Sequence, residues 1–286
     1  MKILFVGVFD ANKQSTNTSQ LLAFKKLGHD VVGYNYRAKA MLLGNEERDV
    51  DLIEVIENRK FDLVLFSKCN VVGYEVFKRA TAATKTCLWF MDPLISYNDE
   101  MRQKTKLVSY VCCDKINVLH AAKELNKNSF HVCEGFDHEV DKPHDLEKNY
   151  KISFIGNIYG NRQEMINSIS EKVHTFNNAY GTEHAKCVSK TLINLNFCTD
   201  NGASDRIYKI MAAKGFLLTD DWKGRDLVDG EHCVVFKNAQ DLNSKIKYYL
   251  QNPSEANKIS LAGYNYVQKY SRLNWAKKIV EYSNVI

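Results

Sequence analysis

The chain of 286 residues is long enough for two α/β domains, and 45% hydrophobic with 26% charged residues is a globular composition. The net charge of +5 permits an anionic ligand but does not require nucleic acid. No apolar run is long enough to cross a bilayer and no secretory leader pattern is seen, so we expect a cytoplasmic protein without a transmembrane segment.

The first half of the chain alternates apolar strands with amphipathic helices. The expected strands are 2–9, 29–36, 61–67, 86–91, 107–112 and 130–133. The expected helices are 19–27, 49–58, 74–83 and 116–125. Strands that alternate with helices predict a parallel, doubly wound sheet.

Residues 137–149 are polar and contain one of the three prolines, which is typical of a linker. The pattern then restarts. The expected strands are 151–155, 192–197, 216–219 and 232–236, and the expected helices are 162–173, 204–214, 239–251, 253–270 and 274–282. We therefore expect two Rossmann-like domains, 1–140 and 141–270, that face a central cleft, and a C-terminal helix within 271–286 that packs back on the first domain.

Two acidic motifs in the first half are candidate sites. Asp92 ends a strand at the carboxyl edge of the sheet, where it serves either as a general base or as a turn residue. Asp49 and Asp51 have the D-x-D spacing of some metal sites, but they precede an apolar helix face. This position favours helix N-capping. The chain shows no convincing metal-ligand cluster, and the first strand-to-helix loop lacks the G-x-G-x-x-G dinucleotide pattern.

One residue breaks the local rules in the second half. Ser204 and Asp205 are good N-cap types for the helix that follows, but Arg206 lies in the first turn, where the helix dipole disfavours a cation. An anion bound there would resolve the conflict, because backbone N–H groups and the guanidinium would converge on it. The alternative is an exposed arginine in a solvated turn.

Further polar residues follow other strands of the second half. The turn that begins with Gly156 and Asn157 can bring backbone N–H groups close to a phosphate, and it leads to a second helix-start cation, Arg162. His184 either lines a nucleotide pocket or is exposed. The pair Asp220 and Asp221 either contacts a ligand or lies in a solvated loop.

Residues 151–162 and 192–282 resemble the C-terminal domain of GT-B glycosyltransferases of the CgeB-like, glycosyl transferases group 1 type. The matching segments are Phe154–Arg162, Leu195-Asn196, Asp205–Gly215, Phe216–Asp220, Asp229–His232, Tyr248–Pro253, Tyr270 and Trp275. The resemblance implies a glycosyltransferase with a GT-B fold. It further implies a UDP- or GDP-sugar donor in the second domain, an acceptor in the first, and no required cofactor or metal. The acceptor stays open: a glycan, a lipid-linked group, a protein or a nucleic acid.

The resemblance also suggests roles for individual residues. The expected catalytic residues are Arg206, which would stabilise the departing diphosphate, and Asp92, the candidate base if the reaction inverts. The expected donor-binding residues are Gly156, Asn157, Arg162, His184, Asn196, Ser204, Asp205, Tyr208, Lys209, Thr219, Asp220 and Asp221.

The chain departs from the family at Lys209, where a glutamate usually holds the ribose hydroxyls. A lysine cannot accept those hydrogen bonds. Another carboxylate (Asp205, Asp220 or Asp221) then holds the ribose, or the donor is bound differently, or activity is lost. The alternatives are a non-catalytic module that binds nucleotide sugars and a transferase that modifies DNA.

Overall fold

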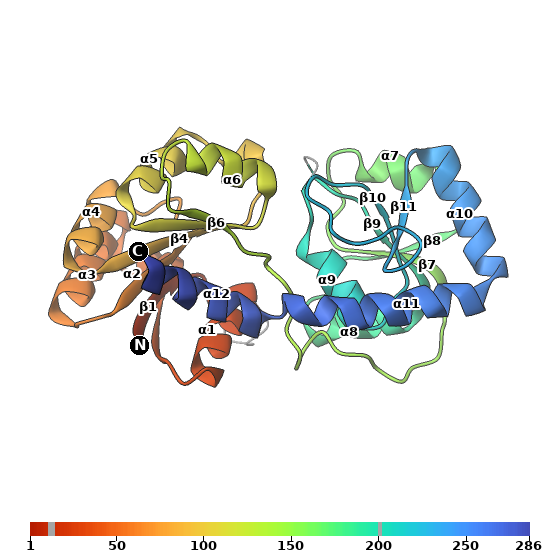
Figure 1. Ribbon diagram of the computed structural model, residues 1–286, viewed down its shortest axis with the longest axis horizontal. Helices are drawn as coiled ribbons and strands as arrows, with labels where there is room; N and C mark the ends of the chain where they lie inside the picture. Colours follow the sequence, from red (N-terminus) through yellow and green to blue (C-terminus); the bar gives the residue numbers. More distant parts are fainter. Residues whose placement is uncertain (11–14, 200–201) are drawn as a thin grey trace. The chain divides into compact units, whose positions relative to one another are not determined.

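The computed structural model describes residues 1–10, 15–199 and 202–286, which fold into two units (Figure 1). Unit 1 consists of residues 1–134 and 272–286, and unit 2 of residues 135–271. The chain thus leaves unit 1 after Glu134 and returns to it at Arg272. No helix in the described part of the chain is long and apolar enough to span a membrane.

Unit 1 is built on a six-stranded parallel sheet with the order β2-β1-β3-β4-β5-β6. Its strands are β1 (Lys2–Gly7), β2 (Asp30–Asn35), β3 (Leu63–Ser67), β4 (Lys85–Phe90), β5 (Tyr110–Cys113) and β6 (Ser129–His131). Its helices are α1 (Thr16–Lys26), α2 (Tyr36–Leu43), α3 (Asn45–Asn58), α4 (Tyr74–Ala83), α5 (Asp99–Leu107), α6 (Ile116–Lys123) and α12 (Arg272–Val285). A short 3-10 turn, η1 (Leu94–Ser96), follows β4.

Both faces of the unit 1 sheet are buried, which explains why its strands are almost continuously apolar. In β1, Leu4 and Val6 pack in the cluster formed with α3 to α6, whereas Ile3 and Phe5 pack in the cluster formed with α1 and α12. The order of the strands reverses between β1 and β3, because the chain first adds β2 on one side of β1 and then adds β3 on the other.

Unit 2 is built on a five-stranded parallel sheet with the order β11-β10-β9-β7-β8. Its strands are β7 (Tyr150–Ile155), β8 (Val173–Phe176), β9 (Thr191–Asn196), β10 (Leu217–Asp220) and β11 (Val234–Phe236). Its helices are α7 (Arg162–Asn167), α8 (Thr182–Ser189), α9 (Asp205–Ala212), α10 (Ala239–Gln251) and α11 (Pro253–Val267), followed by the 3-10 turn η2 (Gln268–Tyr270). The strand order reverses between β7 and β9.

The prediction of two doubly wound parallel sheets is confirmed, and the cleft between the domains stays a prediction. Several local predictions were wrong. The helix expected over 162–173 ends at Asn167, and β8 takes up residues 173–176. The helices α2, α5 and α8 were missed because they are only eight or nine residues long, so their sequences show little helical periodicity.

The predicted N-cap role of Asp49 and Asp51 was also wrong, because both residues lie inside α3. Asp49 accepts a hydrogen bond from the backbone N–H of Gly73 at 2.9 Å and pairs with Arg48 at 2.6 Å. Asp51 accepts from the Tyr34 hydroxyl at 2.7 Å. These carboxylates fasten the sheet and a neighbouring loop to α3.

The C-terminal helix α12 completes the core of unit 1. Trp275 is almost fully buried, and its ring lies 5.3 Å from that of Phe24 and 5.5 Å from that of Trp89. The hydroxyl of Tyr110 in β5 donates to the Ile279 carbonyl at 2.8 Å. The last helix of the chain therefore lies beside α1 and covers one face of the unit 1 sheet together with it (Figure 1).

Trp275→Ala is expected to lower the free energy of unfolding of unit 1 by about 3–5 kcal/mol, because it leaves a cavity against the sheet. Urea denaturation followed by circular dichroism measures the change. Val285→Ala on the same helix is the control, because Val285 is 78% exposed. A loss for Trp275→Ala as small as that of the control would show that α12 is not part of the core.

Candidate functional site

Arg206 bridges the point of unit 2 at which the strand order reverses. It is the second residue of α9, and its Nε donates to the carbonyl of Ile155 at the end of β7 at 2.6 Å. Its Nη1 donates to Oδ1 of Asn196 at the end of β9 at 3.0 Å. Ligands of open α/β sheets bind at the carboxyl ends of the strands on both sides of such a reversal. Arg206 thus lies where this fold holds ligands.

The start of α9 differs from the predicted capping. Ser204 is the N-cap residue, but its hydroxyl donates to Oδ1 of Asn196 at 2.8 Å and makes no cap hydrogen bond to the helix. Asn196 Oδ1 therefore accepts from both Ser204 and Arg206. This ties the first turn of α9 to the end of β9 and leaves the helix start without a side-chain cap from Ser204.

Two guanidinium groups share one aromatic ring at this point. Arg206 lies 4.7 Å and Arg162 lies 5.6 Å from the centroid of the Phe154 ring. Burial, followed by the charge of Arg162, lowers the pKa of the Arg206 guanidinium to about 10. The Arg206 guanidinium stays protonated at neutral pH, and its repulsion with the Arg162 guanidinium makes this a favourable place for an anion.

Arg162 differs from Arg206 in what its donors contact. It is buried, and it donates to the Asn157 carbonyl at 2.9 Å, to the Phe197 carbonyl at 3.3 Å and to the Thr199 hydroxyl at 3.2 Å. Its guanidinium also lies 3.9 Å from the Tyr159 ring centroid. Arg162 thereby fastens the turn after β7 to the segment after β9 and adds positive charge behind Arg206.

Gly156 is required by the position of Arg206. Its φ is +133°, and a Cβ atom built on it would lie 2.6 Å from Nη2 of Arg206. That nitrogen makes no hydrogen bond to the described part of the chain, whereas Nε and Nη1 both do. The missing side chain thus gives Arg206 space at the end of β7.

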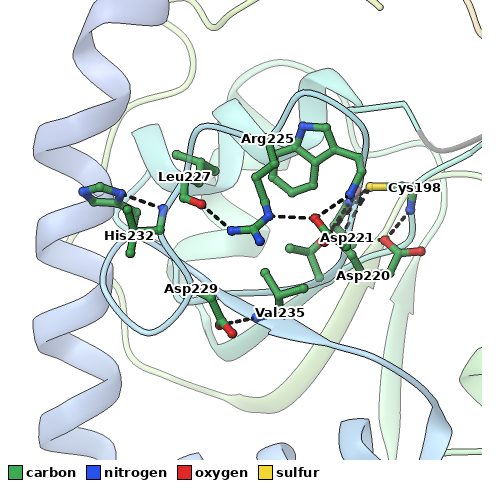
Figure 2. Close-up of polar contacts among 12 residues, drawn as sticks. Cys198, Asp220, Asp221, Arg225, Leu227, Asp229, His232 and Val235 are labelled. Carbon is green, nitrogen blue, oxygen red and sulfur yellow. Dashed lines mark hydrogen bonds and ion pairs between the residues drawn. The ribbon is translucent and has the colours of Figure 1, made fainter. Parts of the chain in front are cut away.

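Buried polar side chains line the ends of β9 and β10. The Asn196 amide donates to the Thr219 hydroxyl at 3.0 Å. The backbone N–H of Cys198 donates to Oδ1 of Asp220 at 2.7 Å (Figure 2). Burial raises the pKa of the Asp220 carboxyl. Thr219 is fully buried, and its hydroxyl fixes the orientation of the Asn196 amide. This orientation places Oδ1 of Asn196 toward Arg206.

The loop after β10 is held by Asp221 and Arg225. Oδ1 of Asp221 accepts from Arg225 Nε at 2.7 Å and from the Trp222 N–H at 2.9 Å, and Arg225 also donates to the Leu227 carbonyl (Figure 2). The hydrogen bond from Arg225 lowers the pKa of the Asp221 carboxyl. Asp221 therefore shapes its own loop, whereas the neighbouring Asp220 faces the strand ends.

Lys209, where the resemblance predicts a glutamate, forms an ion pair with Asp205 one turn earlier, at 2.5 Å. His184 of α8 is buried nearby, and neither ring nitrogen has a hydrogen-bond partner. Burial, followed by the charge of Lys209, lowers the pKa of the His184 imidazole to about 3. His184 is therefore neutral and retains unused hydrogen-bonding capacity. Tyr208 faces another way and is buried, with its ring 5.2 Å from that of Tyr270.

Asp92 belongs to unit 1, separate from the other expected residues. It follows β4, and its Oδ2 lies 2.5 Å from Nζ of Lys68, a residue that directly follows β3. Both side chains are about one third exposed, at 32% and 33%. The sequence analysis missed Lys68, because a lysine after a strand carries no distinctive pattern.

Unit 2 therefore gathers most of the predicted donor-binding residues around Arg206, and Phe154 and Cys198 join them. The sequence analysis missed these two because an aromatic residue and a thiol in apolar strands resemble core residues. Among residues 1–10, 15–199 and 202–286, no group of three or more His, Cys, Asp or Glu side chains is arranged to hold a metal ion.

Comparison with known proteins gives one family match and several fold matches. A family model described as glycosyl transferase-like matches residues 142–281. HepE of Anabaena in complex with UDP-glucose matches with a TM-score of 0.73 at 9% identity over 100% of both chains. Sucrose-phosphate synthase from Thermosynechococcus elongatus matches with a TM-score of 0.68 at 9% identity, covering 100% of this chain and 98% of that one.

T4 phage BGT in complex with its UDP-glucose substrate matches with a TM-score of 0.64 at 12% identity, covering 99% of this chain and 100% of that one. No curated protein matches the chain in sequence. At these identities the structural likeness establishes the fold, which is the predicted GT-B fold of two Rossmann-like domains.

His184 is expected to make folding sensitive to acid. In the unfolded chain the His184 imidazole takes up a proton at its ordinary pKa of 6.5, whereas in the folded protein its pKa is about 3. Because the unfolded state binds more protons between these values, the free energy of unfolding falls as the pH falls, by up to about 1.4 kcal/mol per pH unit from this group.

Urea denaturation at pH 7.5, 6.0 and 5.0 measures this slope. His184→Leu is expected to flatten it, and His120→Gln, which alters an exposed histidine, should leave it unchanged. Equal slopes for the wild type and His184→Leu would contradict the burial of a neutral imidazole.

Proposed function

We propose that this chain, whose residues 142–281 match the glycosyl transferase-like family model, transfers a sugar from a nucleotide-diphosphate sugar to an acceptor hydroxyl. The donor is UDP- or GDP-linked. In support, two of the proteins that share its fold over their whole length, HepE and T4 phage BGT, are described with UDP-glucose bound. Unit 2 binds the donor and unit 1 the acceptor.

The pair of guanidinium groups over Phe154 is the observation that carries this proposal. A diphosphate held at the start of α9 would receive the Nη2 donor of Arg206 and the backbone N–H groups of the helix. Negative charge accumulates on the diphosphate as the bond to the sugar breaks. Hydrogen-bond donors that are already in place at that point stabilise the transition state. Arg206 and the helix start therefore replace the metal cation that other transferases use.

Asp220 is the carboxylate that we assign to the ribose hydroxyls. Of the three candidates, Asp205 is paired with Lys209 and Asp221 with Arg225, whereas Asp220 has no ion-pair partner in the described part of the chain. Its backbone lies at the end of β10, next to the strand that ends at Asn196. A carboxylate that is partly shielded from water gives strong hydrogen bonds to hydroxyl groups, because less water competes for it.

On the acceptor side we assign Asp92 as the base of an inverting transfer. The acceptor hydroxyl gives its proton to the Asp92 carboxylate as its oxygen forms a bond to the anomeric carbon. The bond between that carbon and the diphosphate oxygen breaks, and the electron pair leaves with the diphosphate. The partly exposed position of Asp92 at the end of β4 supports this role.

Arg206→Ala is expected to weaken UDP binding by about 1.5–3 kcal/mol, because it removes a charge-assisted contact to the diphosphate. Isothermal titration with UDP measures the affinity. Arg59→Ala, which alters an exposed arginine of unit 1, is the matched control and should bind UDP like the wild type. An unchanged affinity for Arg206→Ala would refute the assigned role.

Asp220→Asn is expected to remove most of the preference for UDP over 2′-deoxy-UDP. If Asp220 accepts from the ribose hydroxyls, the wild type prefers UDP by about tenfold, which corresponds to one charge-assisted hydrogen bond. Asp205→Asn and Asp221→Asn should keep this preference, because their carboxylates are engaged by Lys209 and Arg225. If Asp205→Asn or Asp221→Asn loses the preference and Asp220→Asn keeps it, the altered residue in that variant binds the ribose hydroxyls instead of Asp220.

A further inference from the structure

The backbone is strained immediately after β3. Lys68 and Cys69 have φ values of +56° and +55°, a left-handed conformation that favours glycine or asparagine. They are the only residues other than glycine with positive φ in the described part of unit 1. A residue with a side chain keeps a left-handed backbone conformation only where its surroundings hold it there. Such residues are enriched at functional sites.

Two fully buried cations enforce this conformation. Lys104 of α5 donates through Nζ to the carbonyls of Cys69 at 2.9 Å and Asn70 at 2.8 Å. Arg48 of α3 donates through Nη2 to the carbonyl of Val71 at 2.6 Å. Three consecutive carbonyls are thus fixed by cations from two helices. Lys104 also pairs with Glu100 at 2.5 Å and Arg48 with Asp49 at 2.6 Å, so both buried cations are well bonded and can hold the strained segment in place.

The strained segment orients Lys68. Its backbone N–H donates to the Trp89 carbonyl at 2.9 Å, and its Nζ reaches Oδ2 of Asp92 at 2.5 Å. Next to it, the Ser67 hydroxyl donates to Oδ1 of Asn17 at 2.9 Å. These groups lie at the carboxyl ends of β3 and β4, beside the reversal of strand order between β1 and β3. In this class of sheet, such a reversal is where ligands bind.

An ion pair between side chains that are about one third exposed does not offset the backbone strain of this segment on its own. Pairs of that kind contribute little to stability, and less than two left-handed residues take away. An ammonium group has three donors, and the contact with Asp92 uses one of them. The other two N–H groups of Lys68 are available to a ligand, and the Asp92 carboxylate beside them can accept hydrogen bonds. This arrangement suits a ligand with neighbouring hydroxyl groups.

We propose that Lys68 is the positioning residue of the acceptor side: it orients the Asp92 carboxylate and donates to a second oxygen of a polyhydroxyl acceptor. The strain after β3 keeps the ammonium at this place. This inference rests on the proposed function, because it assigns a partner to the base of that reaction. The hydroxyl that gives its proton to Asp92 and the oxygen that contacts Lys68 belong to the same acceptor.

The test separates the side chain from the backbone strain. Lys68→Gly removes the ammonium but suits a positive φ, so its melting temperature should equal or exceed that of the wild type. Release of UDP from UDP-glucose, with glucose or glycerol as the acceptor, should lose at least tenfold in kcat. The affinity for UDP should stay within twofold, because the donor binds in unit 2.

Two further variants complete the test. Lys68→Arg keeps a cation beside Asp92 and should recover a large part of the lost kcat. Lys214→Gly is the matched control, because Lys214 is also left-handed, with φ of +54°, but lies in unit 2 at the end of α9. It should gain the same relief of strain with no loss of kcat.

The outcomes distinguish this inference from the proposed function. If UDP binds and the wild type releases UDP, but Lys68→Gly retains the wild-type kcat, Lys68 has no positioning role. If Lys68→Gly loses melting temperature and kcat together and Lys68→Arg recovers neither, the pair is structural and the inference is refuted. If the wild type binds neither UDP nor GDP, the proposed function itself fails.

Discussion

The contact of Arg206 with the ends of two strands is the interaction on which the site of unit 2 depends. One guanidinium joins the Ile155 carbonyl after β7 to the Asn196 amide oxygen after β9. Gly156 leaves room for it, and Phe154 lies beneath it. Because these contacts use Nε and Nη1, the guanidinium is held rigidly before any ligand arrives. Such preorganisation makes a fixed charge effective in catalysis.

The charge around Arg206 explains what the site is built to hold. Arg162 brings a second guanidinium to the same ring, but its Nη1 and Nη2 donate to the backbone carbonyls of Asn157 and Phe197 and to the Thr199 hydroxyl. Lys209 is neutralised by Asp205 one turn away. The positive charge that remains is concentrated at the start of α9, and it is matched to a diphosphate. The exchange of the usual glutamate for Lys209 is thus accommodated within α9 itself.

Much of the fold could be predicted from the sequence, because it depends on patterns that are local. Apolar strands with both faces buried, alternating with amphipathic helices, indicated the parallel sheets. The helices α2, α5 and α8 escaped because each spans only eight or nine residues, too few to show a clear helical period. In the site, Arg206 stood out because it conflicts with the helix dipole. Phe154 and Lys68 did not, because nothing in their local sequence separates them from a core aromatic or a surface lysine.

The sequence alone determined the class of fold, the family resemblance and the residue at which an anion is expected, since these follow from periodicity, motif order and a local electrostatic conflict. Only the tertiary structure decided which partners each polar group has. It paired Lys209 with Asp205, engaged Asp221 with Arg225, buried His184, and left Asp220 without an ion-pair partner in the described part of the chain. The physical reason is that hydrogen bonds and burial join residues far apart in the chain, which no local pattern records.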